Sequence, residues 1–575
     1  MNNELQLFHE RVDDIPLLVG VMTKLGLSEV IDRTLGEHWL HEGISNGWLT
    51  ILWVAYVLSE ADHRKSSVQE WVERHGTTLS RLLEQPLRKD VEANDDRLGI
   101  LLTHLSDDTK WEQLERSLWA ATVAAYEIVE TGVRLDSTTV SGYHTRHEDG
   151  LMQLGHSKDH RPDLAQVKLM AAAAEPTGQW IACDVVSGEQ ADDRLYTPLI
   201  QRVREIIGRC GVLYTGDCKM AALATRAELV HQGDYYVTSL PMTGGVGQQF
   251  DTWVDVAVAG DQVATLIWQE KTLLGAGYEF VRPMLSVIND QPVTWNERVQ
   301  VFRSLTLAQS QATALEERLQ RATADIGKLT PAPGRGKRQH TTEESLVTAF
   351  QQALSRHRVE GLLTITYQKE EESTVQWVGR GRGGPNRETK TVTRVRYVIT
   401  DVQRNHQAIR AQQDRLGWRA LVTNLSEEQM SLSQTVCHYR NAPIMENTFH
   451  LLKDRPLGIS PLYVRNDDQI RGLTRLLTLA LRILTLIQTQ IRQSLQRTGE
   501  ELNGLYDGQP NRTTNQPTTA RLLKAVAHQE VTLTKVVVGQ QVQWHLTPLP
   551  DLILKILHHL GLSPAIYTRL VDNSV

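Results

Sequence analysis

The sequence predicts an α/β protein: a mixed sheet with packed helices, interrupted by a β-rich insertion domain and preceded by a helical N-terminal domain. Three observations lead to this prediction. Helical periodicity covers residues 1–125, strand-like and helical runs alternate from 126 to 242, and strand-like runs dominate from 243 to 425. Helical patterns return over residues 426–500, and residues 501–575 form a C-terminal tail region. At 575 residues the chain is long enough for about three or four domains of roughly 150 residues each.

The bulk composition is that of an ordinary globular protein, with 41% hydrophobic and 22% charged residues. The formal net charge of −7 argues against a uniformly basic coat, so any nucleic-acid binding must depend on local clusters of Lys and Arg. No basic segment followed by an apolar run marks a signal peptide. Four cysteines without paired spacing predict a reduced, cytoplasmic protein with neither a disulfide framework nor a zinc site.

The most apolar stretch of the sequence is Leu473–Ile491. It contains Arg475 and Arg482, which favour a buried helix over a helix that crosses a membrane. We therefore expect the protein to have no membrane partner.

Residues 1–125 are predicted to form a helical domain. Ser45 is placed to cap a helix in which Trp48, Leu52 and Ala55 recur on one face. Six of the 13 tryptophans lie in this region, which favours a compact core. The pattern leaves two roles open: a helix that enters a DNA groove, and a purely structural or dimerising domain.

The stretch Gly132–Gly142 is predicted to be a strand because its β-branched residues pack well on a pleated surface. Asp136 breaks this local rule, and a broken rule inside a consistent element points to a functional site. Taken alone, Asp136 is better explained as the end of a strand that faces solvent. The residues that follow favour the functional interpretation.

Two further strands are predicted at Val167–Ala173 and Trp180–Val186. A helix capped by Asp192 or Asp193 follows, then a strand that ends before Asp217, a helix and a last strand. This order, β-β-β-α-β-α-β, is that of a ribonuclease-H-like fold. In that topology the first and fourth strands are neighbours, so Asp136 and Asp217 should converge although 81 positions separate them.

The β-rich insertion, residues 243–425, is predicted from strand-like runs that alternate with charge-rich helical stretches. The predicted strands are Trp253–Val258, Val263–Trp268, Tyr278–Ile288, Gly361–Tyr367, Thr374–Val378 and Thr391–Thr400. Basic residues are clustered locally in this region, at Arg335, Lys337, Arg338, Arg380, Arg382, Arg387, Arg394 and Arg396. Because side chains alternate along a strand, Arg394 and Arg396 share one face. They are candidates for phosphate contacts, and a merely solvated surface is the alternative.

The chain then returns to helix. Ser426-Glu-Glu-Gln429 is a capping-box pattern, which predicts a helix from there to about Arg440. Pro443 fits the first turn of a second helix, on which Glu446 and Lys453 project from one face. A long helix, Asp467–Arg497, follows. The tail is predicted to hold a linker, a hairpin and a last amphipathic helix.

Together these features resemble the DDE transposases of bacterial insertion sequences, in the branch with a β-rich insertion before the Glu-bearing helix. That branch carries a Tyr-x2-Arg-x3-Glu-x6-Lys signature, and Tyr439, Glu446 and Lys453 fit it. Ala442 stands at the Arg position, and Arg440 is displaced from it by two residues.

The resemblance implies a transposase that cuts the ends of its element and joins them to target DNA. Asp136, Asp217 and Glu446 would hold Mg²⁺, with Mn²⁺ as a substitute, since Mg²⁺ prefers oxygen ligands. Two such ions activate the attacking oxygen and neutralise the leaving one. Lys453 would contact a backbone phosphate, and Tyr439 would lie near the cut strand. The implied partners are double-stranded DNA with terminal inverted repeats, target DNA and a second copy in a DNA-bound homodimer, in the bacterial cytoplasm at the nucleoid.

The loop after the first strand supports two interpretations. Ser157, Lys158 and Arg161 are candidates for a phosphate-binding loop near the active site, similar to the family pattern. The alternative is a zinc site formed by the histidines of the same loop, His144, His147, His156 and His160. No cysteines accompany these histidines, which favours the phosphate-binding interpretation.

Two alternatives to the transposase remain from the sequence: a plain metal-dependent nuclease, and an inactive transposase remnant that only binds DNA. The remnant is motivated by Ala442 and Pro443 in the signature. If the protein is active, Arg440 is the nearest residue to replace the missing Arg, because a kink at Pro443 can turn the preceding helix towards the carboxylates.

Overall fold

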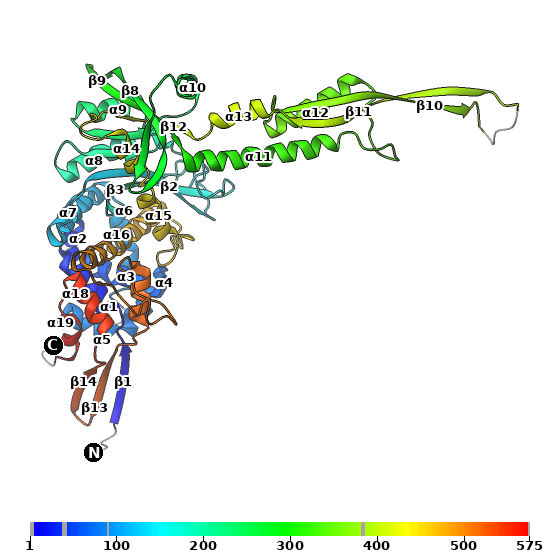
Figure 1. The fold of residues 1–575 in the computed structure, drawn as a ribbon. Helices are drawn as coiled ribbons and strands as arrows, with labels where there is room; N and C mark the ends of the chain where they lie inside the picture. The colour runs from blue at the N-terminus through cyan, green and yellow to red at the C-terminus, as the bar shows by residue number, and fades with distance from the viewer. Residues whose placement is uncertain (1–4, 37–42, 89–90, 381–385, 573–575) are drawn as a thin grey trace. The chain divides into compact units, whose positions relative to one another are not determined.

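The computed structural model describes residues 5–36, 43–88, 91–380 and 386–572 (Figure 1). The chain forms two compact units. Unit 1 consists of Met1–Thr238, Pro283–Asn296 and His438–Val575, and unit 2 consists of Ser239–Arg282 and Glu297–Cys437. The N-terminal helices, which the sequence suggested as a separate domain, therefore belong to the same unit as Asp136, Asp217 and Glu446.

The N-terminal part of unit 1 is mainly helical. Its helices are α1 (Ile15–Lys24), α2 (Leu27–Leu35), α3 (Asn46–Glu60), α4 (Lys65–Arg74), α5 (Gly76–Leu83), α6 (Asp95–Ser106) and α7 (Asp108–Tyr126). The predicted cap of α3 is confirmed, because the Ser45 hydroxyl accepts a hydrogen bond from the N–H of Trp48 at 3.2 Å. Trp53, Trp71 and Trp111 are fully buried and fill the core between these helices.

Five strands of a mixed sheet follow in unit 1: β2 (Gly132–Gly142), β3 (Ala165–Glu175), β4 (Gln179–Ser187), β5 (Leu213–Gly216) and β6 (Tyr235–Ser239). They lie in the order β4-β3-β2-β5-β6. Strands β2, β3 and β4 pair in antiparallel fashion, whereas β5 pairs with β2, and β6 with β5, in parallel. The connections are a short 3-10 turn (Asp192–Arg194), α8 (Tyr196–Ile207) and α9 (Leu223–His231). The predicted succession of elements is thus confirmed for residues 132–239.

The remaining elements of unit 1 lie near the C-terminus. They are α15 (Pro443–Lys453), α16 (Asp467–Thr498), α17 (Thr519–Ala527), β13 (Thr532–Val538), β14 (Gln541–Leu546), α18 (Asp551–Leu560), α19 (Ala565–Thr568) and a 3-10 turn (Arg569–Val571). β13 pairs with β14 and also with β1 (Leu5–Arg11). The helical prediction for residues 1–125 is therefore wrong at β1, whose partner strand comes more than 500 residues later.

Opposite faces of the sheet are covered by α8 and α16. On β4, the Cys183 thiol contacts the Thr478 hydroxyl of α16 at 3.8 Å, whereas Asp184 accepts a hydrogen bond from Arg202 of α8 at 2.5 Å. Neighbouring residues of a strand point to opposite faces, so the two helices lie on different sides.

Helix α16 is buried over most of its length from Ile470 to Ile491, which confirms the prediction of a buried helix for Leu473–Ile491. It packs against α3, α6, α18 and β4. Its two arginines are balanced inside the protein: Arg475 pairs with Asp108, and Arg482 pairs with the fully buried Glu115 at 2.5 Å. Both guanidinium groups also lie over the ring of Trp111. Within the described residues, none of the helices combines the length and the apolar character that crossing a bilayer requires.

Unit 2 begins with a helix where the sequence predicted a strand. Its elements are α10 (Gly244–Ala259), β7 (Thr265–Gln269), β8 (Thr272–Ile288), β9 (Gln291–Ser304), α11 (Leu305–Gly327), α12 (Glu343–His357), β10 (Leu363–Trp377), β11 (Thr389–Arg404), α13 (His406–Asp414), β12 (Trp418–Thr423) and α14 (Leu432–Tyr439). The run Trp253–Val258 alternates like a strand but lies in α10. Only Val254 of α10 is buried, so the alternation reflects surface residues and not a sheet face.

Strand β9 was not predicted. It follows β8 through a turn in which Asn289 and Asp290 have positive φ angles of 49° and 61°. An Asn-Asp pair between two extended runs is a hairpin signal, because both residues tolerate this conformation better than most. Strands of unit 2 lie in the order β12-β9-β8-β7.

The charged run Lys369–Glu372 does not interrupt the insertion's long hairpin. β10 and β11 pair from Leu363–Arg404 to Trp377–Thr389, merging the predicted runs into two long strands (Figure 1). Towards Leu363, the hairpin shares a core with the helices α11, α12 and α13. The buried residues of this core include Leu315, Leu319, Ile326, Leu354, Leu363 and Ile409.

The start of α14 differs from the prediction. Ser426 and Gln429 exchange the two capping-box hydrogen bonds, at 2.9 and 3.3 Å, but only a turn follows. Helix α14 begins at Leu432, after an equivalent pair formed by Ser431 and Gln434 at 2.8 and 3.3 Å. The Arg298 guanidinium donates to the carbonyls of Leu425 and Met430, at 3.1 and 2.8 Å, and so links the two ends of the first turn.

Candidate active site

Asp136 lies in the middle of β2, opposite Ala171 of β3, and Ala171 is opposite Cys183 of β4. Because residues paired across strands share a face, Asp136 lies on the face of the sheet that α16 covers. Its side chain is 34% exposed, whereas the neighbouring Leu135 and Ser137 are buried. Asp136 therefore reaches the surface from an otherwise buried strand.

Asp217 follows the last residue of β5, the strand beside β2. Their parallel pairing places Arg134 beside Thr215, and continuing this register by two residues places Asp136 beside Asp217. Neighbouring strands are separated by about 4.8 Å. The predicted convergence of the first and fourth strands is therefore present.

The pKa of Asp136 also shows that the two carboxylates are close enough to interact. Burial raises the pKa of Asp136, and repulsion from the Asp217 carboxylate adds to the rise. The Lys158 ammonium and the N–H of Ser137 oppose this effect. A carboxylate pair whose charges repel one another is suited to hold a cation.

Asp217 is held by hydrogen bonds from three directions. Its Oδ1 accepts from the Tyr196 hydroxyl at 2.7 Å and from the N–H of Lys219 at 2.9 Å. The Thr238 hydroxyl donates to the Asp217 carbonyl at 2.7 Å. Burial and the Asp217 carboxylate raise the pKa of Tyr196 well above its ordinary value, so the phenol keeps its proton.

Lys158 brings a positive charge to the Asp136 carboxylate. Its Nζ lies 3.3 Å from Oδ1 of Asp136, 2.6 Å from the Ser137 carbonyl and 3.8 Å from Oδ2 of Asp192. Asp192 was expected to cap α8, and this is wrong: its carboxylate accepts a hydrogen bond from Lys168 of β3 at 2.6 Å. Lys158 is therefore placed to neutralise carboxylates from two elements.

A buried charge network that the sequence did not reveal attaches His438 and Tyr439 to the sheet of unit 1. Arg134 is 4% exposed and pairs with Glu175 at 2.5 Å, while its guanidinium also donates to the carbonyls of His438 and Tyr439 at 2.8 and 3.3 Å. The His438 ring contacts Glu175 at 3.2 Å and the Thr215 hydroxyl at 2.8 Å. This network fixes the segment before α15 against the strands that carry Asp136 and Asp217.

Helix α15 packs on the sheet through Met445, Phe449 and Leu452, which are buried. The ring of Phe449 lies edge-on to Trp180 of β4 at 5.9 Å. Glu446 lies on the exposed side of the same helix. Lys453, two turns later, forms an ion pair with Asp159, from the loop that also carries Lys158.

The rest of the signature lies at the turn between α14 and α15. Tyr439 is the last residue of α14 and is half-buried, whereas Arg440 is exposed in the turn. The side chain of Arg440 makes no hydrogen bond or ion pair with any of the residues that the structure describes. Ala442 precedes α15, and Pro443 occupies its first turn as expected.

The other residues of the predicted phosphate-binding loop interact within the loop. The Ser157 hydroxyl accepts hydrogen bonds from the N–H groups of Asp159 and Arg161, at 3.3 and 3.1 Å. Arg161 forms a bidentate pair with Asp163 at 2.8–2.9 Å and is half-exposed. Ser157 thus shapes the turn that presents Lys158 and Asp159.

The sequence suggested two metal sites in this region, one at the loop histidines and one at the three carboxylates. Across residues 5–36, 43–88, 91–380 and 386–572, no three His, Cys, Asp or Glu side chains are gathered closely enough to hold an ion. This applies to the loop histidines and to Asp136, Asp217 and Glu446 as they stand. As ligand types, however, the two adjacent aspartates fit a hard divalent cation, because both offer carboxylate oxygens.

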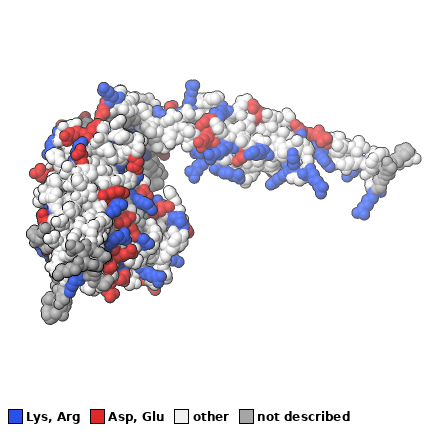
Figure 2. Space-filling view, turned by 90° about the horizontal axis from the view of Figure 1, so that it is seen from below, with Lys and Arg blue, Asp and Glu red and all other residues white. Residues whose placement is uncertain are grey.

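The basic residues of unit 2 lie on and beside β11. Figure 2 shows Lys and Arg side chains along one side of the part of unit 2 that carries the β10–β11 hairpin. Arg394 and Arg396 share one face with Glu372 and Glu370, their partners across the hairpin, and Arg396 forms an ion pair with Glu370. Arg394 is exposed and makes no such contact with any described residue.

The loop with Arg335, Lys337 and Arg338 runs beside β11, because the N–H of Tyr397 donates to the His340 carbonyl at 2.8 Å. The term β11 surface is used below for the basic residues of this loop and of one face of β11, which are Arg335, Lys337, Arg338, Lys390, Arg394 and Arg396. Arg382 lies outside the described residues.

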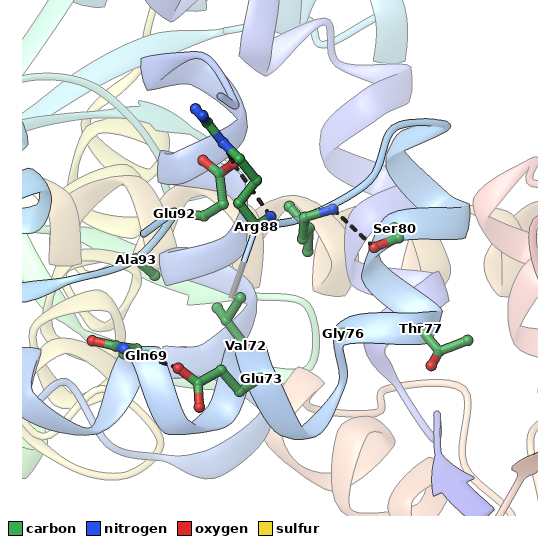
Figure 3. A pocket seen from close by; sticks show the side chains of 10 residues that line it. Gln69, Val72, Glu73, Gly76, Thr77, Ser80, Arg88, Glu92 and Ala93 are labelled. Carbon is green, nitrogen blue, oxygen red and sulfur yellow. Dashed lines mark hydrogen bonds and ion pairs between the residues drawn. The ribbon is translucent and has the colours of Figure 1, made fainter. Parts of the chain in front are cut away.

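A separate pocket of about 270 Å³ lies among the N-terminal helices (Figure 3). Its most buried charged residue is Glu92, which accepts hydrogen bonds from the N–H of Ile44 at 3.1 Å and from Arg97 at 2.5 Å. Although burial opposes it, these donors hold the pKa of Glu92 below its ordinary value. Glu92 therefore serves to attach the chain around Ile44, and this pocket is not part of the carboxylate site.

Comparisons with known proteins give a likeness to solved structures and no match to a family or a curated protein. A solved structure of the piggyBac transposase synaptic complex with hairpin DNA is similar to 99% of this chain and 88% of that chain, with a TM-score of 0.35 and 7% sequence identity.

Proposed function

We propose that this protein is a DNA transposase that cuts at the ends of a mobile element and joins them to target DNA. The observation that carries the proposal is the placement of Asp136 and Asp217 side by side on adjacent parallel strands, with mutual repulsion between their carboxylates. A helix with Glu446 and Lys453 packs over the same face of the sheet. Paired carboxylates next to a cationic side chain suit displacement at a phosphodiester.

The strand order supports a ribonuclease-H-like assignment for the sheet. In order of sequence, the strands β2 to β6 lie as third, second, first, fourth and fifth, with the first three antiparallel and the last two parallel to the first. The Tyr439, Glu446 and Lys453 positions at the end of the insertion agree with the transposase signature named above.

Asp136 and Asp217 would hold the divalent cation, Mg²⁺ or Mn²⁺ as its substitute, and Glu446 would join them from α15. When bound, the ions supply an activated oxygen nucleophile and neutralise the leaving oxygen. The chain's own contribution is to present these oxygens from rigid elements. For Glu446 to complete the set, its exposed side chain has to turn towards the two aspartates.

Lys453 would bind a backbone phosphate as a point charge. In the DNA-free chain its partner is Asp159, so a phosphate would replace that carboxylate. Arg440 remains the candidate for the missing signature Arg, since its side chain is exposed at the turn just before Pro443. Tyr439 would lie beside the cut strand, because its carbonyl is fixed to Arg134 on the strand of Asp136.

Double-stranded DNA is the proposed partner, and the β11 surface is the proposed site of non-catalytic phosphate contacts. Between Leu305 and Arg404 the chain has 16 Lys and Arg against 11 Asp and Glu, whereas the whole chain has a net charge of −7. A local positive excess in an acidic protein limits DNA binding to that surface and makes it dependent on salt. A homodimer assembled on two element ends is part of the same proposal.

A plain nuclease is the second candidate, because it would use the same carboxylates. The two are separated with the full chain, Mg²⁺ and a labelled duplex that carries the DNA flanking the gene, in the presence of a supercoiled target plasmid. A transposase releases 3′ ends and joins them to the plasmid. Cleavage without any joined product would favour the nuclease, and DNA binding without cleavage would favour the inactive remnant.

A further inference from the structure

The two carboxylate oxygens of Asp217 have different surroundings. Oδ1 accepts two hydrogen bonds, from the Tyr196 hydroxyl at 2.7 Å and from the N–H of Lys219 at 2.9 Å. Within the described part of the chain, Oδ2 accepts none. One oxygen is therefore fixed by the protein, and the other is available to a ligand.

Tyr196 is itself held in place. It is the first residue of α8, and its side chain is 1% exposed. Its ring lies directly on the end of β5: a Cβ atom added at Gly216 would lie 3.1 Å from Cε1 of Tyr196. The absence of a side chain at position 216 therefore lets the phenol reach the carboxylate of the next residue.

We infer that Tyr196 is a positioning residue that fixes the orientation of the Asp217 carboxylate and leaves Oδ2 as the oxygen that binds a divalent cation. The inference rests on the proposed function, which makes Asp217 a metal ligand. Hydrogen-bond partners of metal ligands set the orientation of the ligand, and losing one typically weakens metal affinity or activity by about 10–100-fold.

The simpler explanation is that Asp217 merely satisfies a buried hydroxyl. Tyr214 of β5 provides a matched control, because it is also fully buried, but its hydroxyl has no hydrogen-bond partner among the described residues. Tyr214→Phe and Tyr196→Phe thus remove the same atom from neighbouring positions of one core. Only Tyr196→Phe removes a hydrogen bond to a candidate ligand.

The test measures Mn²⁺ binding to the full chain without DNA, by titration calorimetry and by the increase in Tm on adding Mn²⁺. We expect Tyr196→Phe to weaken Mn²⁺ binding by about 10–100-fold. Tyr214→Phe should bind Mn²⁺ as the parent does, and Asp217→Asn should abolish binding at the site. Since each variant is compared with itself with and without Mn²⁺, a general loss of stability does not affect the comparison.

The outcomes separate the inference from the function on which it rests. If Asp217→Asn removes Mn²⁺ binding but Tyr196→Phe binds as tightly as the parent, Tyr196 has no positioning role and the inference is overturned. If Tyr214→Phe weakens binding as much as Tyr196→Phe, the effect is structural and the inference is again overturned. If the parent binds no Mn²⁺ that depends on Asp217, the proposed function fails, and the inference fails with it.

Discussion

In unit 1, Arg134 and Arg482 are almost inaccessible to solvent and each is held by a carboxylate, whereas in the β10–β11 hairpin Arg394 and Arg396 lie on a strand with exposed faces. A buried pair that loses one partner leaves an uncompensated charge, so buried arginines determine stability and geometry. Exposed pairs contribute about 0–1 kcal/mol and can exchange partners. The same residue type is therefore fixed inside the protein in one region, whereas in the other Arg394 and Arg396 lie at the surface, where a charged ligand can compete for them.

Asp136 lies between these extremes, since it is partly exposed and its charge is only partly compensated. We expect Asp136→Asn to reduce DNA cleavage by at least roughly 10²–10³-fold, the loss typical of removing one group that stabilises transition-state charge. Asp217→Asn and Glu446→Gln should do the same. The Tm of Asp136→Asn should not fall, because the raised pKa of Asp136 shows that its charge is unfavourable in the folded state. Cleavage assays and thermal unfolding check both statements, and a variant with near-parental cleavage would leave the candidate site.

The buried pair of Arg482 and Glu115 should give the largest effect on stability. Arg482→Ala should lower the free energy of unfolding by up to about 3–5 kcal/mol, because the buried Glu115 then keeps Arg202, at 3.4 Å, as its remaining cationic partner. The combined variant Glu115→Leu/Arg482→Met should recover much of this loss, since it replaces the pair by apolar groups. Urea unfolding measures both. Equal losses in the single and combined variants would show that packing, and not charge, dominates at this place.

The free energy of unfolding should depend on pH because of the buried carboxyl group of Asp14. Burial raises the pKa of Asp14 to about 7, and the Ser59 hydroxyl is its hydrogen-bond donor. The folded state thus keeps a proton up to about pH 7 that the unfolded state releases near pH 4, so stability falls as the pH rises between these values. At about 1.4 kcal/mol per pKa unit the loss is on the order of 2–4 kcal/mol.

The variant Asp14→Asn should remove this slope and be more stable than the parent above pH 7. Thermal unfolding from pH 4 to pH 8 measures it, with the exposed Asp193→Asn as the control. Parallel pH profiles for the parent and Asp14→Asn would exclude a role for Asp14.

The smallest expected effect concerns the exposed arginines. Arg394→Gln/Arg396→Gln should weaken DNA binding and reduce the slope of log K against log salt by about 1–2, since each phosphate contact contributes about 0.9. Folding should be unaffected. The matched control is Arg321→Gln/Arg404→Gln, which removes two exposed charges that are paired with Glu317 and Glu316. An unchanged slope in the first variant would make the β11 surface a solvated face only.

Local patterns were sufficient for the elements whose signal lies within a few residues. The strand of Asp136, the strand before Asp217 and the cap at Ser45 were all predicted from such patterns, and the order of the elements predicted that β2 and β5 are neighbours. The predictions were wrong where the secondary structure of a segment depends on contacts with distant parts of the chain. β1 was missed because its neighbour is β13, and the alternating run from Trp253 to Val258 lies in the helix α10, of which only Val254 is buried.

The contacts around the site were beyond prediction for a related reason. Arg134 and His438, and likewise Asp159 and Lys453, are about 300 positions apart, so no window of the sequence contains both members of either pair. Tyr196 gave no signal either, because an aromatic residue at the start of an amphipathic helix is normally core. Its role depends on the hydroxyl group, whose partner Asp217 becomes visible only when α8 is packed on the sheet.

The late position of α16 in the chain affects when the protein can fold during its synthesis. This helix is the core on which α3, α6 and β4 pack, yet its first residue, Asp467, comes more than 300 residues after α7. At a synthesis rate of about 5–20 residues per second, the N-terminal helices wait on the order of 20–70 s for the surface that buries them. Glu446 and Lys453 are made only shortly before it. An unfinished chain thus has neither a closed core nor a complete set of candidate site residues.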